Sequence, residues 1–462
     1  MELELQDILK AVDGECLNSL RLHNGIVQSI TIDSRQIDKQ SLFIPLKGER
    51  FDGHQFINKV FDQGAIAVLT EERSIEDDRL CTIYVRDTKK ALLDLAQYYR
   101  SLFKIPVIGI TGSVGKTSTK EIIAAVLSAK FKVHKTEGNY NNEIGLPLTL
   151  FKLEKHHEVA VVELGMNHFG EIHKLSLAAT PQIAVITNIG TSHIEYLGSR
   201  AGILQAKLEI LDGLDTNGVL IINGDNDLLG QMNQISFETL KYGLSPQYPY
   251  YAKNIVGGKQ STTADIVTPQ HHYNLSVEGL GEHMVYNTLA AIAIAEHLGL
   301  TKTEVLAGIE TYRPTKMRMH IQVYDNGITV MDDTYNASTD SMYAALKVLQ
   351  SYPDANRKIA VLGDMFEMGE HAKNLHEEVG RFACQVQIDV LCAVGELAKH
   401  IYEGARQMTS CTKILYYATK EAFLQDMKNI LHSGDTVLFK ASRGMHFEQM
   451  VEEAGKVNGD EQ

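Results

Sequence analysis

The chain contains only five cysteines, has fewer basic than acidic residues, and lacks a long apolar run. A membrane helix needs about 20 consecutive apolar residues, so we expect no membrane span. The N-terminal segment Met1–Asp7 is acidic and has no signal-peptide core, which favours a cytoplasmic location. The cysteines show no C-x-x-C spacing, so we expect neither a zinc knuckle nor a disulfide framework, and reduced, mostly buried thiols instead.

The charge balance also excludes a class of partners. The chain has 44 Lys and Arg against 58 Asp and Glu, a formal net charge of −14. This excess of negative charge disfavours non-specific nucleic-acid binding, and we expect no nucleic-acid partner. A polyanionic small substrate must then be met by local lysine and arginine side chains.

The length of 462 residues is typical of about three domains, and 44% hydrophobic residues are enough for ordinary cores. No repeat or low-complexity linker marks the boundaries, so changes of pattern place them, at 1–103, 104–313 and 314–462. The first segment mixes short strands and helices, which favours a small α/β domain. We expect its strands at 26–32, 41–45, 65–70 and 82–85 and its helices at 55–63 and 88–103.

The second and third segments alternate apolar strands with helices, a rhythm typical of parallel sheets covered on both faces. In the central domain we expect strands at 107–111, 159–163, 183–188 and 219–223 and helices at 118–130, 203–211 and 283–298. The C-terminal domain has expected strands at 328–332, 359–362, 390–394 and 436–440. This last domain is predicted to be Rossmann-like, although it has no G-x-G-x-x-G motif that would imply a nicotinamide cofactor.

The segment Gly109–Ser118 is the strongest functional motif, because it joins a predicted strand to a predicted helix. It follows a G-x-x-G-x-x-G-K-[ST] variant of the phosphate-binding loop, with isoleucine at position 110, where the standard pattern has glycine. Backbone N–H groups of such a loop surround phosphates, Lys116 can reach the terminal phosphates, and the Thr117 hydroxyl can bind Mg²⁺. The expected ligand is ATP or GTP, bound by Gly112, Ser113, Val114, Gly115, Lys116, Thr117 and Ser118.

Polar residues follow other strands of the central domain. Glu163 ends an apolar strand, where its carboxylate can hold Mg²⁺ directly or through water. From spacing alone, His193 is equally consistent with a structural histidine. By the same measure Lys207 is a solvated lysine on a helix.

These residues gain meaning from a resemblance. The chain resembles the Mur ligase family in a series of motifs spread over the central domain: Thr111–Thr117, Glu163, Asn188 with His193, Ala206–Ile210, and Gly281–His283 with Asn287. The resemblance implies that Glu163 and His193 hold Mg²⁺ together with Thr117. It also implies that CO₂ carbamylates Lys207 to make a further metal ligand, and that Asn287 lies near the adenine of ATP.

The flanking segments resemble the branch of this family that joins D-alanyl-D-alanine to a UDP-N-acetylmuramoyl tripeptide. The resemblance lies in Asp33–Arg35, Asp52–Phe56, Asn139–Asn142, Asp332–Ser338, Gly363–Gly369 and Lys440–Arg443. It implies that Arg318 and Asp333 contact ATP from the C-terminal domain. The expected substrate-binding residues are Ser34, Arg35 and Lys47 for the UDP-sugar, together with Asn336, Lys440 and Arg443. Lys440 and Arg443 are expected to meet the dipeptide carboxylate or a phosphate, and Asn336 to lie beside Arg318 and Asp333.

The expected function is therefore ATP-dependent amide ligation through an acyl phosphate, with Lys116, Glu163, His193 and carbamylated Lys207 as the catalytic set. We expect a monomer that needs ATP and Mg²⁺. Two alternatives remain: a ligase similar to folylpolyglutamate synthase, and a P-loop switch that binds nucleotide without ligation. The sequence leaves open whether the third residue of the peptide is lysine or diaminopimelate.

Overall fold

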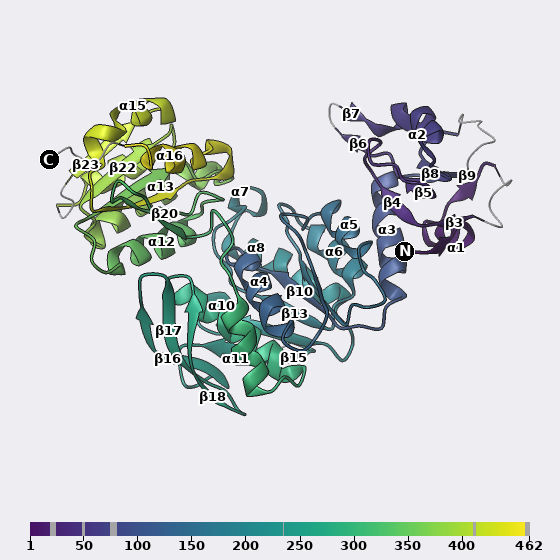
Figure 1. The fold of residues 1–462 in the computed structure, drawn as a ribbon, viewed down its shortest axis with the longest axis horizontal. Coiled ribbons are helices and arrows are strands. Elements are labelled where there is room, and N and C mark those ends of the chain that lie inside the picture. The colour runs from purple at the N-terminus through teal and green to yellow at the C-terminus, as the bar shows by residue number, and fades with distance from the viewer. Residues whose placement is uncertain (19–24, 49–50, 74–80, 234, 410–412, 458–462) are drawn as a thin grey trace.

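The computed structural model describes residues 1–18, 25–48, 51–73, 81–233, 235–409 and 413–457. Three sheets of five or more strands follow one another along the chain, and Figure 1 shows a lobe around each. We call them the N-terminal lobe (residues 1–101), the central lobe (107–311) and the C-terminal lobe (320–457). The central lobe lies between the other two (Figure 1). None of the helices in the described ranges is both long and apolar enough to span a membrane.

The N-terminal lobe contains a five-stranded sheet. Its order is β2 (Glu15–Cys16), β9 (Cys81–Tyr84), β8 (Ala67–Thr70), β5 (Ser41–Phe43) and β4 (Ser29–Thr31), parallel except for β2. The predicted strand at 26–32 divides at Gln28, because β3 (Ile26–Val27) pairs with β1 (Leu3–Glu4) whereas β4 pairs with β5. The remaining elements are α1 (Leu5–Ala11), the hairpin β6 (Lys47–Gly48) and β7 (Phe51–Asp52), η1 (Gly53–Phe56) and α2 (Ile57–Gln63).

Helix α3 (Thr88–Ser101) connects this lobe to the central one. Asp87 caps its N-terminus, with its side chain accepting from the N–H groups of Lys89 and Lys90. Near its other end the Tyr99 hydroxyl donates to the carbonyl of Leu153 at 2.7 Å, and the buried Arg100 donates to that of Ala179. The helix is therefore fixed to the central lobe by buried hydrogen bonds.

The central lobe is built on a nine-stranded sheet. Its order is β11 (Val133–Lys135), β12 (Val159–Glu163), β10 (Val107–Thr111), β13 (Ile183–Ile186), β14 (Val219–Asn223), β15 (Glu238–Gly243), β16 (Tyr250–Gly257), β17 (Ser261–Val267) and β18 (His272–Glu278). The strands from β11 to β16 are parallel. Of these, β10, β12, β13 and β14 were predicted from their continuous apolar runs, whereas β11, β15 and β16 were not predicted. Strands β17 and β18 are antiparallel and were not among the predicted elements.

Helices cover both faces of the central sheet. One face packs on α4 (Lys116–Leu127), α10 (Glu282–His297) and α11 (Lys302–Thr311). The other packs on α5 (Gly145–Leu150), α6 (Glu171–Ala179) and α8 (Arg200–Leu208), and α3 packs on α5 and α6. Short elements α7 (Ile194–Leu197), η2 (Glu209–Gly213) and α9 (Asp227–Gly230) complete the lobe. The sheet is thus buried on both sides and leaves the carboxyl ends of its strands for function.

The C-terminal lobe has a six-stranded sheet in the order β19 (His320–Val323), β20 (Thr329–Asp332), β24 (Asp435–Lys440), β21 (Arg357–Gly363), β22 (Val390–Val394) and β23 (Lys413–Tyr417). All strands are parallel except β19. One face carries α12 (Thr339–Ser351), α13 (Ala372–Gln385) and α14 (Lys399–Arg406), and the other α15 (Lys420–Ile430) and α16 (Glu448–Ala454). Two single turns, η3 (Gly369–His371) and η4 (Arg443–Met445), follow β21 and β24. The α/β class and the three-part architecture agree with the prediction.

The domain boundaries at 103/104 and 313/314 stay predictions, and they fall in the connections between α3 and β10 and between α11 and β19. Cys16, Cys81 and Cys392 are free. Cys384 is disulfide-bonded, so the expectation of reduced thiols is wrong for this residue, and Cys411 lies outside the described residues.

Candidate active site

The phosphate-binding loop lies where the order of the central sheet reverses. Strand β10 runs between β12 and β13, and the loop leaves its carboxyl end to enter α4, the position at which open α/β sheets bind ligands. Gly112 and Gly115 have φ angles of +154° and +85°. A Cβ on Gly112 would lie 1.9 Å from Thr187 Oγ1, so this position admits only glycine.

Neighbouring strands hold the loop in shape. The Val114 N–H donates to Asn188 Oδ1 at 2.8 Å, and the Thr187 hydroxyl donates to the Val114 carbonyl at 2.6 Å. The Ser113 hydroxyl accepts from Gly190 N–H at 2.9 Å. Lys116 Nζ donates to the Gly112 carbonyl at 2.7 Å. These hydrogen bonds fix the shape of the loop between β10 and α4.

A cavity of about 920 Å³ opens beside this loop, between the central and C-terminal lobes. It brings together most of the predicted site: Ser113, Val114, Gly115, Lys116, Thr117, Ser118, Glu163, His193, Asn287, Arg318, Asp333, Asn336 and Lys440 all line it. Gly112, Lys207, Ser34, Arg35, Lys47 and Arg443 are not among the lining residues.

Glu163 and Thr117 form the oxygen-rich side of the cavity. Glu163 ends β12, is only 2% exposed, and accepts from the Thr117 hydroxyl at 3.1 Å. Its other carboxylate oxygen accepts from Asn141 Nδ2 at 2.8 Å. A hydroxyl beside a carboxylate is the hard-oxygen set that Mg²⁺ prefers, so these residues fit that ion.

Lys207 is buried behind the site on α8, with 1% of its surface exposed. Burial lowers the pKa of its amine well below the ordinary value, and the nearby charge of Lys116 lowers it further. Among the described residues no carboxylate forms an ion pair with it. The neutral amine is the form that reacts with CO₂, and a lowered pKa favours that form, so the environment of Lys207 fits the expected carbamate and does not fit a solvated lysine.

His193 lies in the loop after β13, directly before α7, and contacts the C-terminal lobe. Its Nδ1 is 2.6 Å from Glu367 Oε2, and this hydrogen bond holds the pKa of the Glu367 carboxyl below its usual range. Next to it, Asp340 Oδ2 accepts from the N–H of Thr191 at 2.9 Å. Glu367 and Asp340 were not predicted as site residues, because nothing in the sequence pairs them with this loop.

Asn287, on α10, has a free hydrogen-bond donor at the cavity wall. Its Oδ1 accepts from the Thr119 hydroxyl at 2.9 Å, whereas its buried Nδ2 has no partner among the described groups. An orphaned buried donor in a cavity is suited to a ligand acceptor. Asp225 and Tyr286, which were missed, line the same wall and share a 3.0 Å hydrogen bond. Asp225 follows β14, and the strand-end argument applied to Glu163 would have found it.

The C-terminal lobe supplies a charged group to the cavity. The Arg318 guanidinium stacks 3.9 Å from the centre of the Tyr335 ring. Lys440 Nζ lies 2.5 Å from Asp333 Oδ2 and donates to the Asn336 carbonyl at 3.1 Å. Burial and the nearby Arg318 lower the pKa of Lys440, and Asp333 opposes this shift. Lys440 is therefore committed to Asp333 and Asn336 and is not a free cation.

The remaining substrate-binding candidates lie outside the cavity. Arg35 is highly exposed and pairs with Asp33 at 2.8 Å, and Lys47 Nζ lies 3.0 Å from Glu71 Oε2. Ser34 is buried in the same lobe. Arg443 is half-exposed, 3.4 Å from Glu448. In this arrangement Lys89 is the one lining residue that the N-terminal lobe contributes, within the ranges that the structure describes.

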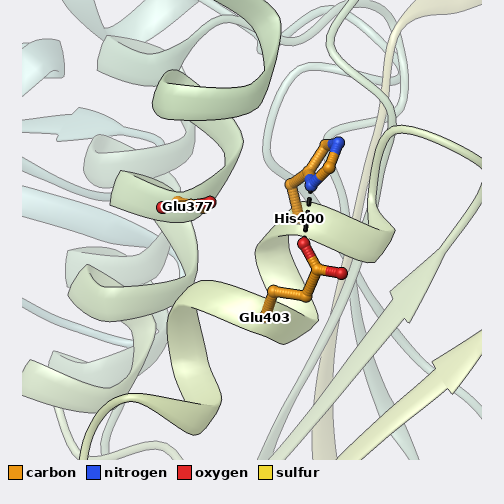
Figure 2. Close-up of side chains that lie close together, drawn as sticks. All are labelled: Glu377, His400 and Glu403. Carbon is orange, nitrogen blue, oxygen red and sulfur yellow. Dashed lines mark hydrogen bonds and ion pairs between the residues drawn. The ribbon is translucent and has the colours of Figure 1, made fainter.

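A second group of potential metal ligands lies away from the cavity, in the C-terminal lobe. Figure 2 shows Glu377 on α13 facing His400 and Glu403 on α14, with His400 Nδ1 2.7 Å from Glu403 Oε2. Arg381 lies 3.3 Å from Glu377 Oε2, and Lys373 lies 4.0 Å from its Oε1. These cations already compensate Glu377, so the group is explained by ion pairs within α13 and within α14.

Comparison with known proteins agrees with this geometry. Residues 110–295 match the Mur ligase middle domain, residues 317–443 the Mur ligase glutamate ligase domain, and residues 26–103 the Mur ligase family catalytic domain. The chain is 40% identical over 451 residues to the UDP-N-acetylmuramoyl-tripeptide–D-alanyl-D-alanine ligase of Bacillus subtilis (strain 168), covering 97% of each protein.

Solved structures give the same result. A crystal structure of MurF from Acinetobacter baumannii superposes with a TM-score of 0.91 at 32% identity, covering 99% of each chain. The MurF ligase from Thermotoga maritima in complex with ADP superposes with a TM-score of 0.84 at 29% identity, covering 93% of this chain and 98% of that one.

Proposed function

Because this chain belongs to the Mur ligase family, we propose that it is the ATP-dependent ligase that adds D-alanyl-D-alanine to UDP-N-acetylmuramoyl tripeptide. The products are the UDP-muramoyl pentapeptide used for peptidoglycan, ADP and phosphate. The observation that carries the proposal is the cavity in which an organised phosphate loop, Glu163 and the C-terminal residues Arg318 and Asp333 meet. The full-length agreement with relatives that bear this activity in their names supports the choice of substrates.

Joining a carboxylate to an amine in water is uphill, so ATP first converts a carboxylate oxygen of the tripeptide into a phosphate leaving group. Transfer of the γ-phosphoryl group needs positioning and neutralisation of charge more than covalent help from the protein. Lys116 and the N–H groups of residues 112–118 supply both at the phosphates. The amine of D-alanyl-D-alanine then attacks the acyl phosphate and releases phosphate.

The residues around the phosphates fit a Mg²⁺ ion held by Thr117, Glu163 and His193, with carbamylated Lys207 as a further anionic group. When bound, Mg²⁺ neutralises phosphate charge during the transfer. The protein's own contribution is to position these groups: Asn141 holds Glu163, and burial lowers the pKa of the Lys207 amine, which favours the neutral form that reacts with CO₂.

At the nucleoside end, the free amide of Asn287 is placed to donate to ATP, beside Asp225 and Tyr286. Arg318 and Asp333 contact ATP from the C-terminal lobe, and Asn336, Lys440 and Arg443 belong to the side that receives the dipeptide. Ser34, Arg35 and Lys47 hold the UDP-sugar. With groups from two lobes around one nucleotide, lobe closure excludes water from the acyl phosphate.

We place the reaction in the cytoplasm, where ATP is available, and propose that the enzyme acts as a monomer. A P-loop switch without ligase activity would give no reason for Arg318, Asp333 and Lys440 to line the nucleotide cavity. A ligase similar to folylpolyglutamate synthase would give no reason for the match of residues 26–103 to the Mur ligase family.

The test is phosphate release from Mg-ATP, measured with and without UDP-muramoyl tripeptide and D-alanyl-D-alanine. We expect release only when both substrates are present. L-alanyl-L-alanine is expected to react at least about 100-fold more slowly, because its inverted centres misplace the attacking amine. Equal rates with both dipeptides, or activity with folate and glutamate, would overturn the proposal.

A further inference from the structure

We propose that Glu367 is a positioning residue for the metal site: it holds His193 by Nδ1 and so reserves Nε2 of the imidazole for the metal ion. The inference rests on the proposed function, because it concerns the Mg²⁺ site of the ligase. It adds a residue from the C-terminal lobe to a site otherwise built by the central lobe.

The contact itself leaves the ring a single free nitrogen. His193 Nδ1 lies 2.6 Å from Glu367 Oε2 in an ion pair, and apart from this contact the buried nitrogen has no hydrogen-bond partner among the described groups. His193 lines the phosphate cavity, whereas Glu367 does not. The carboxylate therefore lies behind the imidazole as seen from the cavity, and Nε2 is the atom left to meet a ligand there.

The loop that carries Glu367 is docked on the segment that carries His193. The Glu195 N–H donates to the Glu367 carbonyl at 3.2 Å. A Cβ on Gly369 would lie 3.0 Å from Glu195 Cγ, so the two segments are closely packed. They meet at α7, where the central and C-terminal lobes adjoin (Figure 1).

On its other side the same loop is fixed to the C-terminal sheet. The Phe366 N–H donates to Ser442 Oγ at 2.8 Å, and the Ser442 N–H donates to the Asp364 carbonyl at 3.0 Å. The Asp364 carboxylate in turn accepts from the Ala398 N–H at 2.7 Å. Glu367 is therefore held in a fixed position relative to the C-terminal sheet. Hydrogen bonds between the motifs 363–369 and 440–443 contribute to holding it there.

Backbone strain marks both partners of the contact. His193 and Glu367 have φ angles of +63° and +62°, in the left-handed region that non-glycine residues rarely adopt. Each such residue costs on the order of 1 kcal/mol and persists where the surroundings enforce it. Because both residues of this ion pair adopt the strained conformation, the contact is consistent with a functional role.

The chemistry gives that purpose. A histidine that binds a metal through one ring nitrogen almost always donates its other N–H to a carboxylate or carbonyl, which fixes the tautomer and the ring orientation. Glu367 supplies this partner across a lobe boundary. Docking of the C-terminal lobe on α7 therefore completes the metal site. The affinity of the site for the ion should fall when this docking is lost.

The experiment measures binding of Mn²⁺, as a spectroscopic substitute for Mg²⁺, to the full-length protein with ADP by electron paramagnetic resonance. We expect Glu367→Ala to weaken Mn²⁺ binding by about 10- to 100-fold. Glu367→Gln keeps an oxygen acceptor for the Nδ1 proton and is expected to lose less. The matched control is Glu370→Ala. It removes the same charge three residues further along the chain, and the Glu370 side chain is 90% exposed. This variant should bind Mn²⁺ like the wild type.

The outcomes separate this inference from the proposed function. Unchanged Mn²⁺ affinity in Glu367→Ala would overturn it, and so would tighter binding, which would make the ion pair a competitor of the metal. Wild-type affinity in His193→Ala would overturn it as well. If Glu367→Ala weakens Mn²⁺ binding but the wild type releases no phosphate in response to D-alanyl-D-alanine, the inference stands and the proposed function fails.

Discussion

Replacing Lys207 by methionine should make the protein more stable at neutral pH while abolishing ligation. The amine is 1% exposed, no described carboxylate pairs with it, and its pKa is lowered well below the ordinary value. The pKa of this amine is therefore lower in the folded state than in the unfolded chain, where it is about 10.4. Between the two pKa values the unfolded state binds one more proton, so this lysine destabilises the fold, and methionine of similar volume does not.

The sign and size of the pH dependence follow from that one proton. The unfolding free energy of the wild type should rise with pH by up to about 1.4 kcal/mol per unit between the two pKa values of Lys207, relative to Lys207→Met. The advantage of the variant thus shrinks from pH 7 to pH 9, as urea unfolding in CO₂-free buffer would show. Added bicarbonate should stabilise the wild type alone, because it modifies only a chain that has this amine.

Lys120→Met is the matched control, because Lys120 is equally buried but has partners. Its Nζ donates to the Thr136 carbonyl at 2.6 Å and lies 3.0 Å from Glu121 Oε1. Removing it should destabilise the fold by about 1 to 3 kcal/mol. If the stability difference between wild type and Lys207→Met stays constant from pH 7 to pH 9, the pKa of Lys207 is not lowered by folding, and the argument for the carbamate fails with it. Rescue of Lys207→Ala activity by short carboxylates would support it.

Two further predictions concern the phosphate loop and the C-terminal lobe. Lys116→Ala should lower the ligation rate by at least about 10²- to 10³-fold. Its free energy of unfolding, measured by urea denaturation, should fall by no more than about 1.5 kcal/mol, since a single hydrogen bond to Gly112 is removed. Wild-type turnover would contradict the assignment. Asp333→Ala should destabilise the fold by about 3 to 5 kcal/mol, because it leaves the Lys440 amine buried without its carboxylate. The double variant Asp333→Ala/Lys440→Met should recover most of that loss in the same urea assay, and a single variant as stable as the wild type would show that Lys440 has another partner.

The sequence predicted the parallel strands that are buried on both faces, but not the less buried parallel strands β11, β15 and β16. Strands 107–111, 159–163, 219–223 and 390–394 agree with β10, β12, β14 and β22 to the residue. The antiparallel strands β17 and β18 were missed, although each alternates buried and exposed residues. Their pattern is weaker because one face is more exposed and the buried residues include Thr262 and Tyr273.

The chemistry of the site was predictable where one lobe builds it, and not where two lobes meet. Glu163 and Lys116 lie at strand and helix ends whose positions follow from local pattern. The partners Glu367 and Asp340 depend on how the C-terminal lobe docks, which no local pattern contains. Resemblance alone separated Lys207 from an ordinary surface lysine, and the structure gives the physical reason, which is its burial.

The distance of Ser34, Arg35 and Lys47 from the phosphate cavity is consistent with their proposed role, because the substrate is long. Its reacting carboxylate lies at the far end of a tripeptide, and an extended peptide covers about 3.3 to 3.6 Å per residue. The UDP end must therefore bind well away from the γ-phosphate. Helix α3 provides a stiff connection of this kind, since its buried contacts through Tyr99 and Arg100 fix it to the central lobe while its first turn brings Lys89 to the cavity wall. A lobe held by α3 can accordingly bind the nucleotide sugar while the tripeptide extends toward ATP.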